Sequence, residues 1–100
     1  MTRGTTPINR FRCVGVDLTD VEVLYITYKQ EDFVVLEKEK EDCEIEWEYA
    51  SVMLSQEETL AFSPNVPVDI QIRGRFQNGN AFATDVVTVN VNDVQKDGVI

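Results

Sequence analysis

The sequence predicts an all-β, mainly antiparallel fold: an immunoglobulin-like β-sandwich of about seven strands with one short helix near residues 55–62. Three observations favour this class. Short segments alternate between apolar and polar residues, as strands with one buried face do. Turn-forming residues separate these segments at regular intervals. The chain has 100 residues, which suits a single domain over residues 1–100. A small open barrel fits the same pattern, and spacing alone does not separate it from a sandwich.

The longest alternating stretch is a predicted β-hairpin over residues 66–91, on which the other strands are expected to pack. Its turn is predicted at Asn78-Gly79, because this dipeptide readily supplies the two positive φ angles of a type I′ turn. That turn would set Ile70 opposite Val87 and match apolar residues along nearly the whole ladder. The expected inner face of the first arm consists of Val66, Val68, Ile70, Ile72, Gly74 and Phe76.

The rest of the chain divides into shorter elements. Ser55 followed three residues later by Glu58 is a capping box, so a short helix is expected there, and Ser63-Pro64 would end it. The polar stretches at residues 1–7 and 93–100 are expected to form flexible arms. Further strands are expected at residues 8–16, 21–29, 33–37, 43–48 and 51–54.

Cysteine and tryptophan positions give three expectations. The only cysteines are Cys13 and Cys43, and the chain has no histidine, so a structural zinc shell cannot be completed. A reducing compartment disfavours a disulfide, and we expect two buried free thiols on neighbouring strands. Trp47 alternates with acidic residues and is expected in the core, although with Tyr49 it also fits a surface on which sugars stack.

Composition argues against several functions. The formal net charge of −9 disfavours nucleic acid and an anionic membrane as partners, since phosphates would be repelled. Without histidine a Ser-His or Cys-His nucleophile pair is excluded, and solvated carboxylates lack the desolvation that a general acid needs, so no enzyme is expected. No cofactor or metal is expected either. The acidic residues 31–48 could hold Ca²⁺, but a solvated strand face is their expected role.

The outer face of the predicted hairpin combines arginines with apolar residues, and such a face indicates contact with another part of the chain or with a partner. Asp85 would point inward opposite Ile72, which conflicts with its charge. A β-bulge near residues 83–85 would resolve the conflict by turning Asp85 outward toward the arginines. The predicted interface residues on this face are Arg73, Arg75, Phe82 and Val86.

Charge along the chain predicts a second contact. Arg10 and Arg12 lie in a first segment that has no acidic residue before Asp17, whereas residues 31–48 carry the acidic excess. Arg10 and Arg12 are therefore expected to contact the acidic strand face of a neighbouring subunit. Head-to-tail contacts of this kind can close into a ring.

Several motifs along nearly the whole chain are shared with one known family. They are Arg3-Gly4-Thr5-Thr6-Pro7, Val34-Val35-Leu36-Glu37-Lys38, Asp42-Cys43, Leu54-Ser55-Gln56-Glu57-Glu58-Thr59-Leu60, Pro67-Val68-Asp69-Ile70-Gln71-Ile72-Arg73 and Lys96-Asp97-Gly98-Val99-Ile100. In these motifs the chain resembles a family of small proteins encoded by phages and prophages of Firmicutes, which has no assigned activity.

The resemblance implies a phage structural or assembly protein of the tail or baseplate region. Such a protein acts by association with itself or with other phage structural proteins. An adhesion or carbohydrate-binding β-sandwich module is the alternative. No apolar run suggests a secretory signal or a membrane span. We therefore expect the protein in the cytoplasm of the bacterial host during expression, with the virion as a further location once it is assembled.

Overall fold

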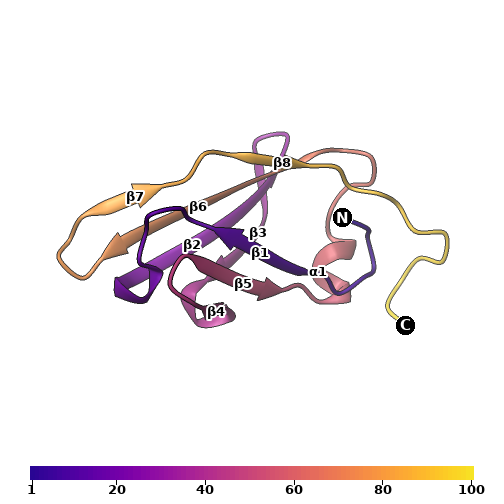
Figure 1. Cartoon of the computed structure of the whole chain (residues 1–100). Helices are drawn as coiled ribbons and strands as arrows, with labels where there is room; N and C mark the ends of the chain where they lie inside the picture. The colour runs from indigo at the N-terminus through magenta and orange to yellow at the C-terminus, as the bar shows by residue number, and fades with distance from the viewer.

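Eight β-strands and one short α-helix make up the fold in the computed structural model, which describes residues 1–100 (Figure 1). The prediction of an all-β, mainly antiparallel sandwich is confirmed. Two 3-10 turns, η1 (Leu18–Asp20) and η2 (Lys40–Asp42), and the helix α1 (Gln56–Leu60) connect the strands. The strands are β1 (Ile8–Arg12), β2 (Val21–Gln30), β3 (Phe33–Glu39), β4 (Cys43–Ile45), β5 (Tyr49–Met53), β6 (Val68–Phe76), β7 (Ala81–Ala83) and β8 (Val87–Val89).

Two sheets of unequal width pack face to face. The smaller sheet has the strand order β1-β5-β4. The larger sheet has the order β3-β2-β6-β7, and β8 pairs with the first half of β6. Between them lies a cluster of 14 buried apolar residues. The inner face predicted for the first arm of the hairpin is confirmed for Val68, Ile70 and Ile72, which are buried from β6. On β2 the buried side chains include Leu24, Ile26 and Tyr28.

The turn of the central hairpin differs from the prediction. Arg75 lies opposite Ala81, and the Phe76 N–H donates to the Asn80 carbonyl at 2.8 Å, so the loop has three residues instead of two. Gly79 has a φ of 92°, but Asn78 has no positive φ, and the turn is therefore not type I′. A three-residue loop with glycine in the left-handed region is the next most common hairpin connection.

Farther from the turn the predicted register is confirmed. Ile70 lies opposite Val87 and Val68 lies opposite Val89. Closer to the turn, Arg73 pairs with Ala83. The return arm needs one more residue to go from Ala83 to Val87 than β6 needs to go from Arg73 to Ile70, so the two registers differ by one residue. This extra residue is a bulge at residues 84–86, where a bulge was predicted, and it divides the return arm into β7 and β8.

The shifted register moves Phe82 to the inner face. Phe82 lies opposite Gly74, and its ring centroid is 5.3 Å from that of Phe76. The prediction that Phe82 shares the outer face with Arg73 and Arg75 is therefore wrong. An aromatic ring laid over a strand glycine supplies the contact that the missing side chain cannot make.

A type I′ turn does occur, between β2 and β3. Gln30 pairs with Phe33, so the loop is Glu31-Asp32, and these residues have φ angles of 50° and 67°. Two consecutive positive φ angles define the type I′ geometry that joins antiparallel strands without splaying them. Neither residue is glycine or asparagine, so the usual sequence signal for this turn is absent.

The capping box of α1 is confirmed. The Glu58 N–H donates to Ser55 Oγ at 3.1 Å, and the Ser55 N–H donates to Glu58 Oε1 at 2.9 Å. The other Glu58 oxygen lies 2.6 Å from Lys38 Nζ, which ties α1 to β3. These contacts hold the helix against the end of the sandwich.

Both segments that are predicted to be flexible arms make contacts with the rest of the fold. The Met1 ammonium donates to the Asn90 carbonyl at 2.8 Å. Arg3 donates to the carbonyls of Phe62 and Leu60 and forms an ion pair with Asp93 at 2.6 Å. At the other end, the side chain of Gln56 forms two hydrogen bonds with the backbone of Ile100.

The core prediction for Trp47 is wrong. Glu46 and Tyr49 exchange backbone hydrogen bonds of 2.9 and 3.2 Å across a tight turn, so Trp47 lies at the tip of a hairpin with 56% of its surface exposed. Cys13 is buried and Cys43 half-buried, both as free thiols, and burial raises the pKa of each. They are not on neighbouring strands, since β5 separates β4 from β1.

Replacing Glu31-Asp32 with Asn-Gly should stabilise the protein. The left-handed conformation costs an ordinary residue roughly 1–2 kcal/mol, whereas glycine and asparagine adopt it readily. We expect urea unfolding to show a gain of about 1 kcal/mol in the free energy of unfolding. Gly79→Ala is the matched control, and it should destabilise the protein because Gly79 has a φ of 92°. An unchanged midpoint for the Asn-Gly variant would contradict the turn assignment.

Gly74→Ala should destabilise the protein through a clash with Phe82. A Cβ on Gly74 would lie 2.6 Å from Cε1 and 2.8 Å from Cζ of that ring. Overpacking of this kind costs about 1–3 kcal/mol, measurable by urea unfolding. The same substitution should cost less in a Phe82→Ala background, where the ring is gone. Equal costs in the two backgrounds would show that Phe82 does not cover Gly74.

Candidate interface at the open side of the sandwich

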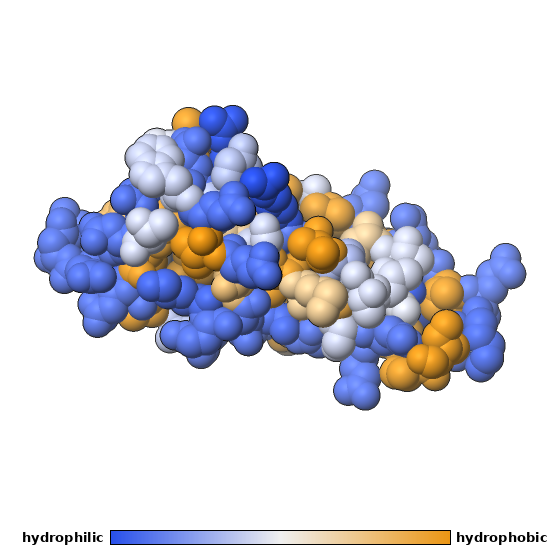
Figure 2. Space-filling model, turned by 60° about the horizontal axis from the view of Figure 1, so that its bottom comes forward, coloured by the Kyte–Doolittle hydropathy of each residue, from blue (hydrophilic) through white to orange (hydrophobic).

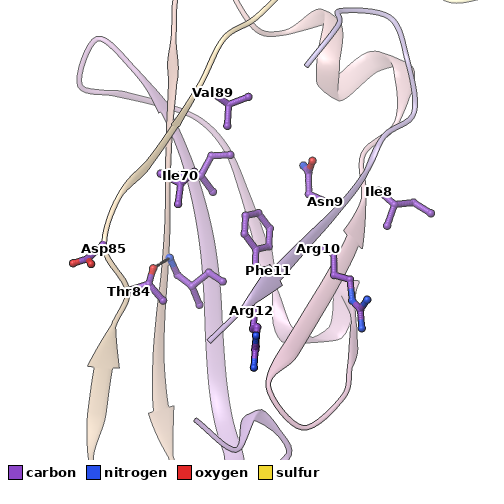
Figure 3. A pocket seen from close by; sticks show the side chains of 11 residues that line it. Ile8, Asn9, Arg10, Phe11, Arg12, Ile70, Thr84, Asp85 and Val89 are labelled. Atoms are coloured by element: carbon purple, nitrogen blue, oxygen red, sulfur yellow. Dashed lines mark hydrogen bonds between the residues drawn. The ribbon is translucent and has the colours of Figure 1, made fainter. Parts of the chain in front are cut away.

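The smaller sheet leaves part of the larger sheet uncovered beside β1. Val87 lies opposite Ile70 on the inward face, yet 52% of its surface is exposed. A groove of about 420 Å³ runs between β1 and the inner side of β6 and β8, and Phe11 points into it toward Ile70 (Figure 3). A second hollow of about 450 Å³ shares four of its lining residues and continues it. We call the two together the open groove. Its apolar lining is Ile8, Phe11, Cys13, Val14, Val16, Ile70, Ile72, Phe82, Ala83, Val87 and Val89.

The backbone of β1 is unpaired on the side that faces the open groove. The Pro7 carbonyl and the Cys13 N–H both bond to the chain of β5, at 3.0 and 2.7 Å. Because bonded positions alternate along an antiparallel strand, the N–H and C=O groups of Ile8, Arg10 and Arg12 point away from β5. None of these three residues has a backbone partner outside the ladder. The edge can therefore accept another strand.

The return arm of the hairpin has a free edge as well. The Thr84 N–H donates to the Ile72 carbonyl at 2.9 Å, so the even-numbered residues of β6 bond toward β7 and β8. This alternation directs the backbone N–H and C=O groups of Val87 and Val89 toward β6. The backbone groups of Thr88 point outward, away from β6. The next outward positions are already paired, because Met1 and Arg3 form a short parallel bridge with the segment 90–92.

The other sheet edges carry features that discourage strand addition. β3 has a register irregularity opposite Tyr28 and Lys29, and its Lys38 points inward to the ion pair with Glu58. Bulges and inward charges are known devices for protecting an edge. Exposed Phe33 lies at the turn end of this strand, and β4 is only three residues long. On the lower side of the molecule, where β4 and β5 lie, apolar groups are small and separated by polar residues (Figure 2).

Arg10 and Arg12 are paired within the chain. Arg10 lies 3.4 Å from Glu46 and 3.9 Å above the centre of the Tyr49 ring, and Arg12 lies 3.2 Å from Glu48. The hydrogen bond from the Gly15 N–H, together with the Arg12 guanidinium, holds the pKa of Glu48 below its usual value. The acidic partners predicted on a neighbouring subunit are therefore present in the same chain. The two arginines remain 55% exposed along the outer face of β1.

The six predicted interface residues belong to two surfaces. Arg10 and Arg12 lie on β1 beside the open groove, and Phe82 lines that groove. The remaining three, Arg73, Arg75 and Val86, lie on the outer face of the larger sheet, where Arg75 is 3.7 Å from Glu22.

Asp85 forms no ion pair with Arg73 or Arg75, although the bulge was predicted to turn it toward them. Its side chain points away from β1, past the free edge of the return arm (Figure 3). Sequence reasoning did not single out Val87 and Ile8, which line the open groove. The one available signal was that Ile8, an apolar residue, shares its strand face with two arginines.

The chain holds no group of three or more His, Cys, Asp or Glu side chains placed to bind a metal ion. None of its helices has the length and apolar character needed to cross a membrane. No protein-family model, curated protein or solved structure matches the chain. The resemblance to the phage family therefore stays a prediction.

The Glu48 carboxyl should titrate at a lower pH in the folded protein than in urea. Because its folded pKa is depressed, its contribution to stability is present above the unfolded pKa and is lost as pH falls through the folded pKa. Carboxyl NMR on ¹³C-labelled protein measures both midpoints. Arg12→Ala should raise the folded midpoint only in part, since the Gly15 N–H remains. A Glu48 midpoint equal in both states would contradict this arrangement.

Proposed function

We propose that this protein is a phage or prophage structural or assembly protein of the tail or baseplate region, and that it acts by taking up a β-strand of another protein at the open groove. The observation that carries the proposal is the open side of the sandwich, where an unpaired strand edge runs beside uncovered apolar residues. Addition of a strand to such an edge is a common mode of protein recognition.

The incoming strand would extend the smaller sheet by one member. Its backbone would pair with the outward groups of Ile8, Arg10 and Arg12, and each such hydrogen bond adds about 0.5–1.5 kcal/mol net. Its inward side chains would cover Val87 and Phe82, and full burial of a side chain of this size is worth about 1.5–3 kcal/mol. Backbone pairing gives affinity, while the apolar positions select the sequence of the incoming strand.

The setting is supported by charge and by the resemblance. A net charge of −9 disfavours polyphosphate partners and leaves proteins as the class that the surface fits. The resemblance to phage and prophage proteins supports a role in the particle, reached from the host cytoplasm where the chain is made. The partner is then another copy or a different structural protein.

One observation favours the alternative, a carbohydrate-binding or adhesion module. Trp47 is exposed at the tip of a rigid hairpin, where an indole face is available to a pyranose ring. Against this, neither aromatic ring pair in the chain includes Trp47, so it lacks the second ring of a stacking platform. Titration of oligosaccharides separates the two functions, since only the alternative predicts a saturable change in Trp47 fluorescence. It also predicts binding heat in calorimetry that is lost in Trp47→Ala.

In a lysogen whose prophage carries this gene, deletion of the gene should stop the production of complete particles after induction. Wild-type protein supplied in trans should restore them, as judged by electron microscopy. Arg10→Pro should fail to restore them, because proline removes an outward N–H of β1 without breaking a bond to β5.

Arg10→Ala is the matched control for the particle assay. It loses the same charge and ring contact but keeps the backbone N–H, so it should restore far more complete particles than Arg10→Pro does. Both variants must first show cooperative unfolding. Normal particles from the deleted prophage would refute the proposed function, and normal particles with Arg10→Pro would refute the strand-addition mechanism.

A further inference from the structure

We infer that the open groove is filled by a second copy of the chain, in a two-fold symmetric dimer whose two larger sheets overlap. This inference rests on the proposed function, because it names the partner of the same site. In the dimer, β8 of each copy would add to the free edge of β1 of the other copy. The uncovered inner faces around Val87 would pack against each other.

The shape of the open side suits this arrangement. The larger sheet extends past β1, so that inner-face residues of β8 have no strand of the smaller sheet above them. Consider a two-fold axis that is parallel to the strands and midway between the two sheets. Rotation about this axis places the larger sheet of one copy level with the smaller sheet of the other. The β8 edge of each larger sheet then lies beside β1 of the other copy. One operation fills both grooves, which is the self-complementarity that a two-fold contact requires.

Strand direction is consistent with antiparallel pairing. β1 runs from the end of the molecule near the N-terminus toward β7, whereas β8 runs back toward the C-terminus (Figure 1). Rotation about an axis parallel to the strands preserves these directions, so β1 of one copy would meet β8 of the other in antiparallel orientation. Both strands offer unpaired backbone groups on the edges that meet: Ile8, Arg10 and Arg12 on β1, and Thr88 on β8.

Charge favours the same pairing. Asp85 lies at the free edge of the return arm with no cation within ion-pair distance, and Arg10 and Arg12 line the opposite edge with about half of each side chain exposed. The symmetric alternative, β1 against β1, would place Arg10 opposite its own copy, and like charges directly opposite are destabilising. Pairing of β1 with β8 instead brings the unpaired carboxylate of Asp85 to the arginines.

The full-length protein should form a dimer whose stability depends on Val87. Sedimentation over roughly 1 µM to 1 mM should show a monomer–dimer equilibrium, and Val87→Asp should raise the dissociation constant at least about tenfold. Val34→Asp is the matched control. Val34 is 56% exposed, against 52% for Val87, but it lies on β3, at the other edge of the larger sheet. The control should leave the dissociation constant unchanged.

Charge reversal tests the edges that meet. Asp85→Arg alone, and Arg10→Glu with Arg12→Glu, should each weaken the dimer, and the triple variant should recover it. Amide hydrogen exchange at Ile8, Arg10, Arg12 and Thr88 should slow as protein concentration rises. Each variant is first checked for cooperative unfolding, so that loss of the dimer is not loss of the fold.

The outcomes separate this inference from the proposed function. A wild-type chain that stays monomeric throughout would overturn the dimer, while the particle assay would still decide the function. A dimer equally stable with Val87→Asp, or weakened equally by Val34→Asp, would place the contact elsewhere and also overturn the inference. A dimer that behaves as expected beside normal particles from the deleted prophage would refute the function alone.

Discussion

One extra residue in the return arm of the central hairpin decides which side chains the open side presents. Up to Ala83 the arm follows one register with β6, and from Val87 it follows another. Because of the bulge between the two registers, the adjacent valines lie on different faces of the larger sheet. Val86 is on the outer face and Val87 is on the inner face. The bulge also leaves the charged side chain of Asp85 at the free edge, where burial does not penalise it. If the β8 register continued unchanged toward the turn, Asp85 would face the core opposite Ile72.

The unequal widths of the sheets determine the rest. A five-stranded sheet offers more inner surface than a three-stranded sheet can cover. The β3 side of the larger sheet is covered by η2 and β4, so the uncovered inner surface lies on the β8 side. Core residues of β2 and β6 are almost fully buried, yet the inner face at Val87 remains half exposed. Exposed inner-face residues beside an unpaired edge are unfavourable in an isolated chain, and strand addition relieves both costs at once.

Alternation in the sequence was sufficient to predict the strands β2 and β6 and the residues that β6 buries, because a period of two fixes the faces of a long strand. It could not show where a strand ends: the pattern continues through Glu46 and Trp47 although the chain turns there, and so Trp47 was misplaced. Asn78-Gly79 did not distinguish a two-residue from a three-residue loop, since both accept glycine at positive φ. The groove itself was beyond prediction, because it depends on how far one sheet extends past the other.

Charge patterning along the chain was ambiguous for a related reason. Complementary segments can pair within one chain or between chains, and the sequence does not say which. Arg10 and Arg12 reach across 36 residues to Glu46 and Glu48 of the same chain. This pairing leaves the β1 edge close to neutral on a protein with a net charge of −9. Two copies with this net charge repel each other. At distances within a Debye length of about 8–10 Å, the local charge of the touching surfaces matters most, and the near-neutral β1 edge adds little repulsion. In the proposed dimer, the acidic surface would keep copies apart except where β1 meets a complementary strand, so the edge would be selective as well as adhesive.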